Sequence, residues 1–465
     1  MQNTSQTEQL EHGIIFPLVV RLIVPAVVAQ LVTFLYNIVD RMYVAGLADG
    51  GMDALAALGI VLPVTLILTA FAHLVGLGGA PRAGIRMGES HFDEANRIFN
   101  TAFTLLTIIG LAAGVVTFAL AREIVLWFGC PVASVAYAVS YLRIYACGSL
   151  FAMFAQGLNP FILTQGYSGL AMATVLCGAV LNIALDPLFI YVFDMGVAGS
   201  ALATVLSQIV SCTCIFGFFF SKKSLFRLRL PDMKLSGARV WSILSLGVTP
   251  FVMTITECAI QIVFNVCLKR ATDGDGDYTA ALTVMLSALQ LISLPLNGIG
   301  HGMQPFVSYN YGRGSESRLK RGIGYATAIA FLYCVTVWSF SMLCPWVWAR
   351  LFSASDRVTE IVTAHCPHFL FGSIMFFVQM SLQNINVALG QAKSALCLAV
   401  MRKVVILIPL CVILTHFLGY RGVYLSEGIA DLVAGIITAC VIGYTFPRLF
   451  RRRAEEVREK MGEEK

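Results

Sequence analysis

The chain has 465 residues, of which 58% are hydrophobic and only 12% are charged. Soluble globular domains carry about 25% charged residues, so this composition excludes a water-soluble fold and makes lipid the solvent. The net charge is +6, but no basic domain with interleaved aromatic residues accompanies it, and we expect no nucleic-acid partner.

Twelve apolar runs follow one another along the chain, and each is long enough to cross about 30 Å of hydrocarbon. Their length and continuity are typical of α-helices and not of the alternating strands of a barrel. The first run has no convincing cleavage site, so we expect it to stay as a membrane anchor. In chain order the predicted spans are 14–38, 54–78, 98–120, 133–157, 170–192, 196–220, 240–267, 279–305, 323–347, 361–387, 396–418 and 423–446.

The two halves of the chain resemble each other. Gly78 and Pro81 recur as Gly302 and Pro305, at a shift of about 224 residues. Six spans in each copy begin and end on the same side, which indicates two parallel lobes. We therefore predict an all-α membrane protein of twelve transmembrane helices, in two six-helix lobes related by pseudo-twofold symmetry. Further pairs are Pro25 with Pro250, Gly88 with Gly312, Gly166 with Gly390, Gly196 with Gly419, and Gly199 with Gly422.

The repeat and the charges together predict the domain organisation. We expect a first lobe over 1–220, a basic linker over 221–239, a second lobe over 240–447 and a charged tail over 448–465. Lys and Arg concentrate in the linker, in the tail and in the loops on the same side. The positive-inside rule then places both termini in the cytoplasm of a plasma-membrane protein. The same basic loops are expected to contact anionic membrane lipid.

Motifs of enzymes and metal centres are missing from the sequence. It contains no HExxH, GxSxG or paired-aspartate motif. Its 13 cysteines show no ligand spacing and are expected to be free thiols in apolar surroundings. We therefore expect no enzymatic activity and no resident cofactor, and we expect a monomer.

Two carboxylates lie in apolar runs of the first lobe. Asp40 shares a helix face with Tyr36 and Asn37, because positions i, i+3 and i+4 are neighbours on a helix. Asp186 shares a face with Asn182 in the same way. An ionised carboxylate within a membrane costs several kcal/mol and usually faces a cavity, a partner or an ion.

Further oxygens in the first lobe come from Thr204 on the sixth helix and Asn159 at the end of the fourth. This set suits Na⁺, which takes several hard oxygen ligands, with Asp40 and Asp186 as its charged ligands. It suits a proton held by a carboxyl group equally well. The alternatives are that Asp40 is a helix-end residue at the outer interface and that Asp186 is a structural hydrogen-bonded carboxyl.

The second lobe carries a polar stripe on the seventh helix, formed by Glu257 and Gln261, and Gln290 on the eighth helix is expected to line the same cavity. We interpret Glu257 as a cation-binding or proton-coupling residue. On the last helix Glu427 and Asp431 are four residues apart, and Arg402 and Lys403 are available to neutralise Asp431. For this last cluster a structural ion pair is favoured over a role in transport.

Pro25 lies inside the first apolar run. A proline within a helix removes one backbone hydrogen bond and bends the helix. The bend is either a static kink or a hinge that a transport cycle uses. Arg143 is a further charge in an apolar run, and the sequence assigns it no partner.

Two segments resemble signatures of a known family. Pro25 is followed by LYNIVDRMYVAG over 35–46 and LAALG over 55–59, and the second half contains GMQPFVSYNYG over 302–312. Together with the six-plus-six layout, these segments resemble the multidrug and toxic compound extrusion (MATE) transporters, specifically the branch with DNA-damage-inducible and MepA-like members. The resemblance covers about residues 15–447.

The resemblance implies a V-shaped protein that exports cationic, amphipathic small molecules in exchange for Na⁺ or H⁺. It also implies a first-lobe cation site. Glu257 matches an acidic position of another branch, whose tenth-helix Asp has no counterpart here. The positions that match the first-lobe site are Asp40, Asn159, Asn182, Asp186 and Thr204.

The sequence thus predicts a secondary active multidrug efflux antiporter that works by alternating access. Tyr36, Asn37, Glu257, Gln261 and Gln290 are the predicted substrate-binding residues, and Pro25 is the predicted hinge. The alternative is a flippase for lipid-linked precursors from the related superfamily. Such proteins often have more helices and an Arg-lined cavity, which the carboxylate-rich runs here disfavour.

Overall fold

The computed structural model describes residues 2–47, 51–273, 275–352 and 355–463. Over these ranges the regular elements are helices, and no strand is formed. Twelve spans within the described residues are long and apolar enough to cross a membrane, from Ile15–Val44 to Tyr420–Glu459. The predicted all-α class and the twelve predicted spans are confirmed.

The chain divides into two compact units. One comprises Met1–Gly13 and Val28–Thr254, and the other comprises Ile14–Val27 and Ile255–Lys465. The cuts fall inside two long helices, α2 (Ile15–Ala45) and α9 (Gly237–Ala271), close to Pro25 and Pro250. The first part of each helix therefore belongs to a different unit from the rest of its own repeat. The lobe, linker and tail boundaries expected from the sequence stay predictions.

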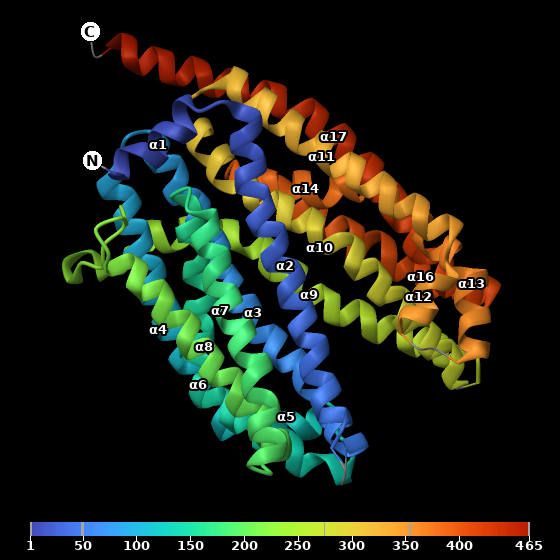
Figure 1. The fold of residues 1–465 in the computed structure, drawn as a ribbon. Helices are drawn as coiled ribbons and strands as arrows, with labels where there is room; N and C mark the ends of the chain where they lie inside the picture. The colour runs from blue at the N-terminus through green and yellow to red at the C-terminus, as the bar shows by residue number, and fades with distance from the viewer. Residues whose placement is uncertain (1, 48–50, 274, 353–354, 464–465) are drawn as a thin grey trace. The chain divides into compact units, whose positions relative to one another are not determined.

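The first unit is built around α6, which packs against α3, α4 and α8. In Figure 1, α4, α6, α7 and α8 run side by side. Part of the basic linker is fixed to this bundle, because Phe226 packs against Phe99 and Phe161. The elements of the unit besides parts of α2 and α9 are α1 (Gln2–His12), α3 (Gly51–Gly88), α4 (Phe92–Ala119), α5 (Ala121–Trp127), η1 (Val132–Ser134), α6 (Val135–Thr164), α7 (Ser168–Pro187), η2 (Leu188–Val192), α8 (Gly196–Phe220) and η3 (Leu230–Met233).

In the second unit α10 packs against α11, α13 and α14, and α17 packs against α13, α14 and α16. Two of its spans are irregular: a 3-10 segment, η4, interrupts the tenth, and a π-helix, η5, interrupts the eleventh. The elements besides parts of α2 and α9 are α10 (Gly276–Gly312), α11 (Glu316–Leu343), α12 (Trp346–Leu351), α13 (Asp356–Leu370), η4 (Phe371–Met375), α14 (Phe376–Ala388), α15 (Ala392–Val400), η5 (Met401–Leu407), α16 (Ile408–Leu418) and α17 (Tyr420–Glu463).

Glycines allow the first parts of α2 and α9 to pack closely within the unit that is formed mostly by the other repeat. In the first unit, Gly247 of α9 lies directly against the backbone of Leu74 in α3, where no Cβ would fit. In the second unit, a Cβ on Gly302 of α10 would lie 2.8 Å from the Ile23 Cα of α2, too close for any side chain. Small residues let membrane helices approach backbone to backbone. The first helix of each repeat thus packs on the second helix of the other repeat.

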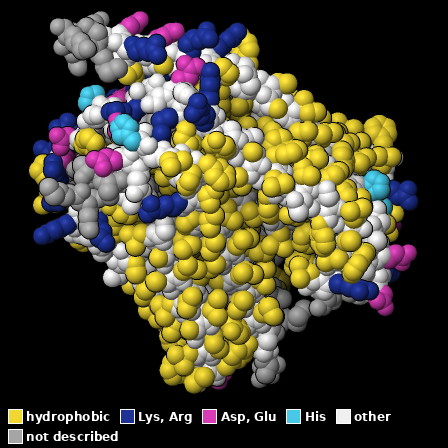
Figure 2. Space-filling model, turned by 45° about the horizontal axis from the view of Figure 1, so that its top comes forward, with side chains coloured by type: hydrophobic (Ala, Val, Ile, Leu, Met, Phe, Trp, Pro, Cys, Tyr) yellow, Lys and Arg dark blue, Asp and Glu magenta, His cyan; other side chains and the backbone are white. Residues whose placement is uncertain are grey.

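The surface agrees with a membrane-spanning fold. Hydrophobic side chains cover most of the face shown in Figure 2, while Lys and Arg gather at its edges. A surface of this kind is stable in lipid and would aggregate in water.

Candidate functional site

The first unit brings the two predicted carboxylates together. Asp40 comes from α2 and Asp186 from α7, and each is the other's nearby charge. The Asp40 Oδ1 accepts a hydrogen bond of 2.6 Å from the Ser200 hydroxyl of α8. Asp186 is fully buried, with an exposed fraction of 0%. Three helices therefore converge on one pair of acidic groups.

Asn182 links the pair to α8. Its Nδ2 donates to the Asp186 Oδ1 at 3.4 Å and to the Thr204 hydroxyl at 3.5 Å. The Asp186 Oδ2 and the Asn182 Oδ1 are buried and accept no hydrogen bond. In the part of the chain that the structure describes, no Lys, Arg or His forms an ion pair with Asp186. Two buried acceptors beside a second carboxylate require a cation or a proton, because unpaired buried charge is costly.

The second unit holds a cluster of opposite character. The Asp431 Oδ1 accepts a hydrogen bond from Arg402 Nε at 2.8 Å and lies 2.7 Å from Arg402 Nη2, and Glu427 Oε1 lies 3.2 Å from the same Nη2. The Arg402 guanidinium also lies over the Phe376 ring, 5.1 Å from its centroid. All three charged residues are buried. The ion pair expected between the eleventh and twelfth spans is confirmed.

The neighbouring Lys403 forms an ion pair with Glu257 of α9. The Lys403 side chain is only 4% exposed, whereas that of Glu257 is 56% exposed. Both cationic residues lie on the π-helix η5. A π-turn inside a membrane helix shifts the side chains that follow it and is frequent at functional sites.

A family model decides the relationship of the chain. The MatE model matches it twice, over residues 25–188 and 250–413. The chain belongs to the MatE family. The two matches lie in the two halves and confirm the internal repeat, and the chain is a MepA-like MATE transporter with twelve membrane spans.

Relatives and solved structures agree with this assignment. Multidrug export protein MepA of Staphylococcus haemolyticus (strain JCSC1435) is 23% identical over 440 residues, which is 93% of this chain and 94% of that protein. MepA of Staphylococcus aureus (strain MRSA252) is 23% identical over 444 residues, which is 94% of this chain and 95% of that protein.

Two solved MATE structures resemble the fold with a TM-score of 0.88 and 25% identity. One is a MATE protein in complex with MaL6, covering 95% of this chain and 99% of that chain. The other is an outward-facing multidrug resistance MATE family transporter of the MOP superfamily, covering 95% and 98%. MATE proteins are transporters and not enzymes, so the expectation of a transport protein is supported.

Asn159 is the remaining residue predicted for the MATE cation site, and Asn37 is one of the predicted substrate-binding residues. Asn159 donates to the Ala171 carbonyl at 3.0 Å and to the Thr174 hydroxyl at 2.9 Å, two turns before Asn182 on α7. Asn37 donates to the Thr33 carbonyl at 2.7 Å within α2. The hydrogen bonds of Asn159 are made to α7 and not to the carboxylate pair, whereas Asn37 lies one turn from Asp40 on α2, beside Tyr36. Their roles, and those of Tyr36, Gln261, Gln290 and Pro25, stay predictions.

Two residues beside the acidic pair were not expected from the sequence. Ser200 bonds Asp40, and the buried Tyr141 of α6 lies beside Asp40 and Thr204. Ser200 precedes Thr204 by four residues on α8 and so shares its face. That spacing is the signal that would have found Ser200, whereas the sequence offers no comparable signal for Tyr141.

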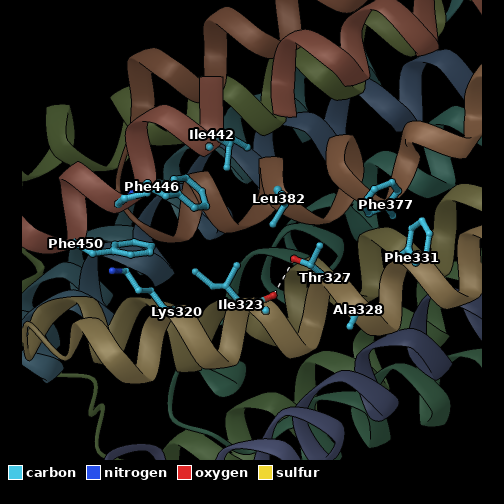
Figure 3. A pocket seen from close by; sticks show the side chains of 13 residues that line it. Lys320, Ile323, Thr327, Ala328, Phe331, Phe377, Leu382, Ile442, Phe446 and Phe450 are labelled. Carbon is cyan, nitrogen blue, oxygen red and sulfur yellow. Dashed lines mark hydrogen bonds between the residues drawn. The ribbon is translucent and has the colours of Figure 1, made fainter. Parts of the chain in front are cut away.

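Two other features lie apart from both acidic clusters. Arg143, to which the sequence assigned no partner, lies over the Phe118 ring, 5.8 Å from its centroid. A groove of about 550 Å³ runs between α11, α14 and α17. Figure 3 shows its apolar lining, including Phe331 and Phe446, with Lys320 near Phe450. This groove shares no residue with the acidic pair or with the Arg402 cluster.

Proposed function

We propose that this MATE protein is a secondary active exporter of cationic amphipathic small molecules, driven by Na⁺ or H⁺. Asp40 and Asp186 take up the coupling ion, with Asn182, Ser200 and Thr204 around them. Both termini lie in the cytoplasm, because most Lys and Arg fall in the loops and tail on that side. The similar proteins are multidrug export proteins, which supports export of several small molecules.

One observation carries the coupling site. The Asp186 Oδ2 and the Asn182 Oδ1 are buried acceptors without a donor, next to a second carboxylate. A proton on either carboxyl, or a Na⁺ bound by several of these oxygens, would relieve both deficits. Binding of either ion removes a negative charge from the site. A bound organic cation is then held less strongly, since a ligand shifts an equilibrium only through differential affinity.

The test is dye export by reconstituted protein. Asp186→Asn should abolish ethidium efflux from proteoliposomes under both imposed gradients while leaving folding nearly intact. Asp194→Asn is the matched control, because Asp194 is exposed in the next loop with a φ of 52°, which Asn adopts readily. The wild-type response to a Na⁺ gradient or a pH gradient identifies the coupling ion. Full efflux by Asp186→Asn would refute the site.

A further inference from the structure

The second unit contains five charged residues in one connected set, and the MATE assignment gives none of its basic members a role. Three are carboxylates and two are cations, so the set has one excess negative charge when all five are ionised. Each member lies close enough to others of the set for their charges to interact. The set consists of Glu257, Arg402, Lys403, Glu427 and Asp431.

The excess charge has a definite location. Arg402 forms ion pairs with two carboxylates, Glu427 and Asp431. The second oxygen of each carboxylate, Glu427 Oε2 and Asp431 Oδ2, accepts no hydrogen bond. Both residues are more than nine-tenths buried. Two buried carboxylates with one guanidinium are neutral only if they also hold a proton or a second cation.

The second cation of the set, Lys403, already has an ion-pair partner. Lys403 pairs with Glu257, and its buried side chain also feels the charge of Glu427. Lysine is a flexible point charge with three donors, so it can serve either carboxylate by rotating its stem, whereas the planar guanidinium of Arg402 is fixed by its hydrogen bonds. Glu257, in contrast, exposes more than half of its side chain.

Other titratable side chains on the packed elements do not enter the set. His365 of α13 stacks on Tyr424, with ring centroids 5.3 Å apart, one turn before Glu427. Cys411 of α16 has Cys267 and Ser426 as its neighbours. The segments η4 and α14 carry no acidic or basic residue. Glu427 is thus a second carboxylate whose charge acts on Lys403, and it is available to Lys403 when Glu257 binds another cation.

We propose that Lys403 is a tethered counter-ion that an organic cation displaces from Glu257, and that the displaced ammonium moves to Glu427 and expels a proton held by the Glu427–Asp431 pair. The O–H bond of the carboxyl group breaks, its electron pair stays on the carboxylate, and the proton passes to water. The set is neutral before and after, because one organic cation replaces one proton. The proposal rests on the proposed export of organic cations and supplies a proton-binding site in the second unit.

The geometry predicts opposite effects of two substitutions on cation affinity. Lys403→Met removes the internal competitor, so Glu257 should bind tetraphenylphosphonium more tightly, by about tenfold. Glu427→Gln removes the place to which Lys403 moves, so the same probe should bind more weakly by about the same factor. Lys393→Met is the matched control, since Lys393 is exposed on α15 and lies outside the set. Its affinity should equal that of the wild type.

Proton release is the second readout. Full-length protein with Asp40→Asn and Asp186→Asn should still release about one proton per bound probe at about pH 7.5, measured with an indicator dye in weak buffer. Adding Lys403→Met or Glu427→Gln should abolish the release. If one of these variants fails to fold, the other still tests the proposal through its own direction of affinity change.

The outcomes separate this proposal from the proposed function. Weaker binding by Lys403→Met, tighter binding by Glu427→Gln, or proton release that survives both substitutions would overturn the role of Lys403. These measurements need no transport, so a failure of the Asp186→Asn efflux test leaves them valid. A wild-type protein that binds no tetraphenylphosphonium would overturn the substrate class and this proposal together.

Discussion

In the first unit Asp186 is buried without an ion-pair partner among the described residues, whereas in the second unit Asp431 accepts a hydrogen bond from Arg402 and forms an ion pair with it. The same repeat has therefore produced one acidic pair without a basic partner among the described residues, and one that shares the buried Arg402. The shift that pairs Gly199 with Gly422 also places Thr204 opposite Glu427. A position with a neutral hydroxyl in one copy is thus a charged position in the other.

The comparison shows that burial of a carboxylate does not by itself identify an ion-coupling site. What distinguishes the two sites is the supply of positive charge from within the chain. Removing one partner of a buried ion pair is strongly destabilising, because the other charge is left buried without compensation.

The largest effect is expected from replacing Arg402, which tests whether positive charge from within the chain distinguishes the two sites. Arg402→Gln should destabilise the protein by about 3–5 kcal/mol, because it strands two buried carboxylates without a partner. Asp186→Asn should leave the melting temperature nearly unchanged, since no cation loses its partner there. Thermal unfolding in detergent, followed by fluorescence, measures both.

A compensating variant controls for loss of packing around Arg402. Adding Glu427→Gln and Asp431→Asn to Arg402→Gln removes the unpaired charge and should recover most of the lost stability. If the triple variant is as unstable as Arg402→Gln alone, then the cluster stabilises the fold by packing and not by charge pairing.

A second prediction concerns the hydroxyl that orients Asp40. Ser200→Ala removes a 2.6 Å hydrogen bond to the carboxylate, and we expect the rate of ion-driven efflux to fall about tenfold. Ser200→Thr keeps the hydroxyl and should retain most of the activity. Equal rates for Ser200→Ala and the wild type would show that Asp40 is positioned by α2 and not by α8.

The smallest effect is expected at Asn159. Its amide is held by Thr174 and the Ala171 carbonyl, so it acts on the acidic pair only by holding α7 in place. We expect Asn159→Ala to change the apparent affinity for the coupling ion by less than about threefold, consistent with the modest strength of hydrogen bonds between membrane helices. A larger change in the ion dependence of efflux would mean that Asn159 is a direct ligand.

The sequence predicted the spans well, because each requires about 20 apolar residues and little else. It also grouped Asn182 with Asp186 correctly, since both lie on one helix face. It could not show that Ser200 reaches Asp40, or that Lys403 meets Glu257, because these pairs are 160 and 146 residues apart. Periodicity assigns a residue to a face of its own helix, but the neighbour on that face depends on how helices cross.

The sequence also could not predict that the first parts of α2 and α9 pack in the unit formed mostly by the other repeat. Hydropathy counts both as the first helix of their own repeat. The contacts at Gly247 and Gly302 show which helix each segment packs on. A backbone crossing leaves little trace beyond a small residue, and the chain has 40 glycines.

These crossings have a consequence for the protein cut into halves. In a single repeat, the surface of the second helix would be exposed, because the first helix of the other repeat normally covers it. The first helix of that single repeat would also lack the helix on which it normally packs. Two copies of one half would satisfy each other by exchanging these segments, as in a domain-swapped homodimer. Fusion of two such genes would preserve every contact of the exchanged pair and make the dimer permanent.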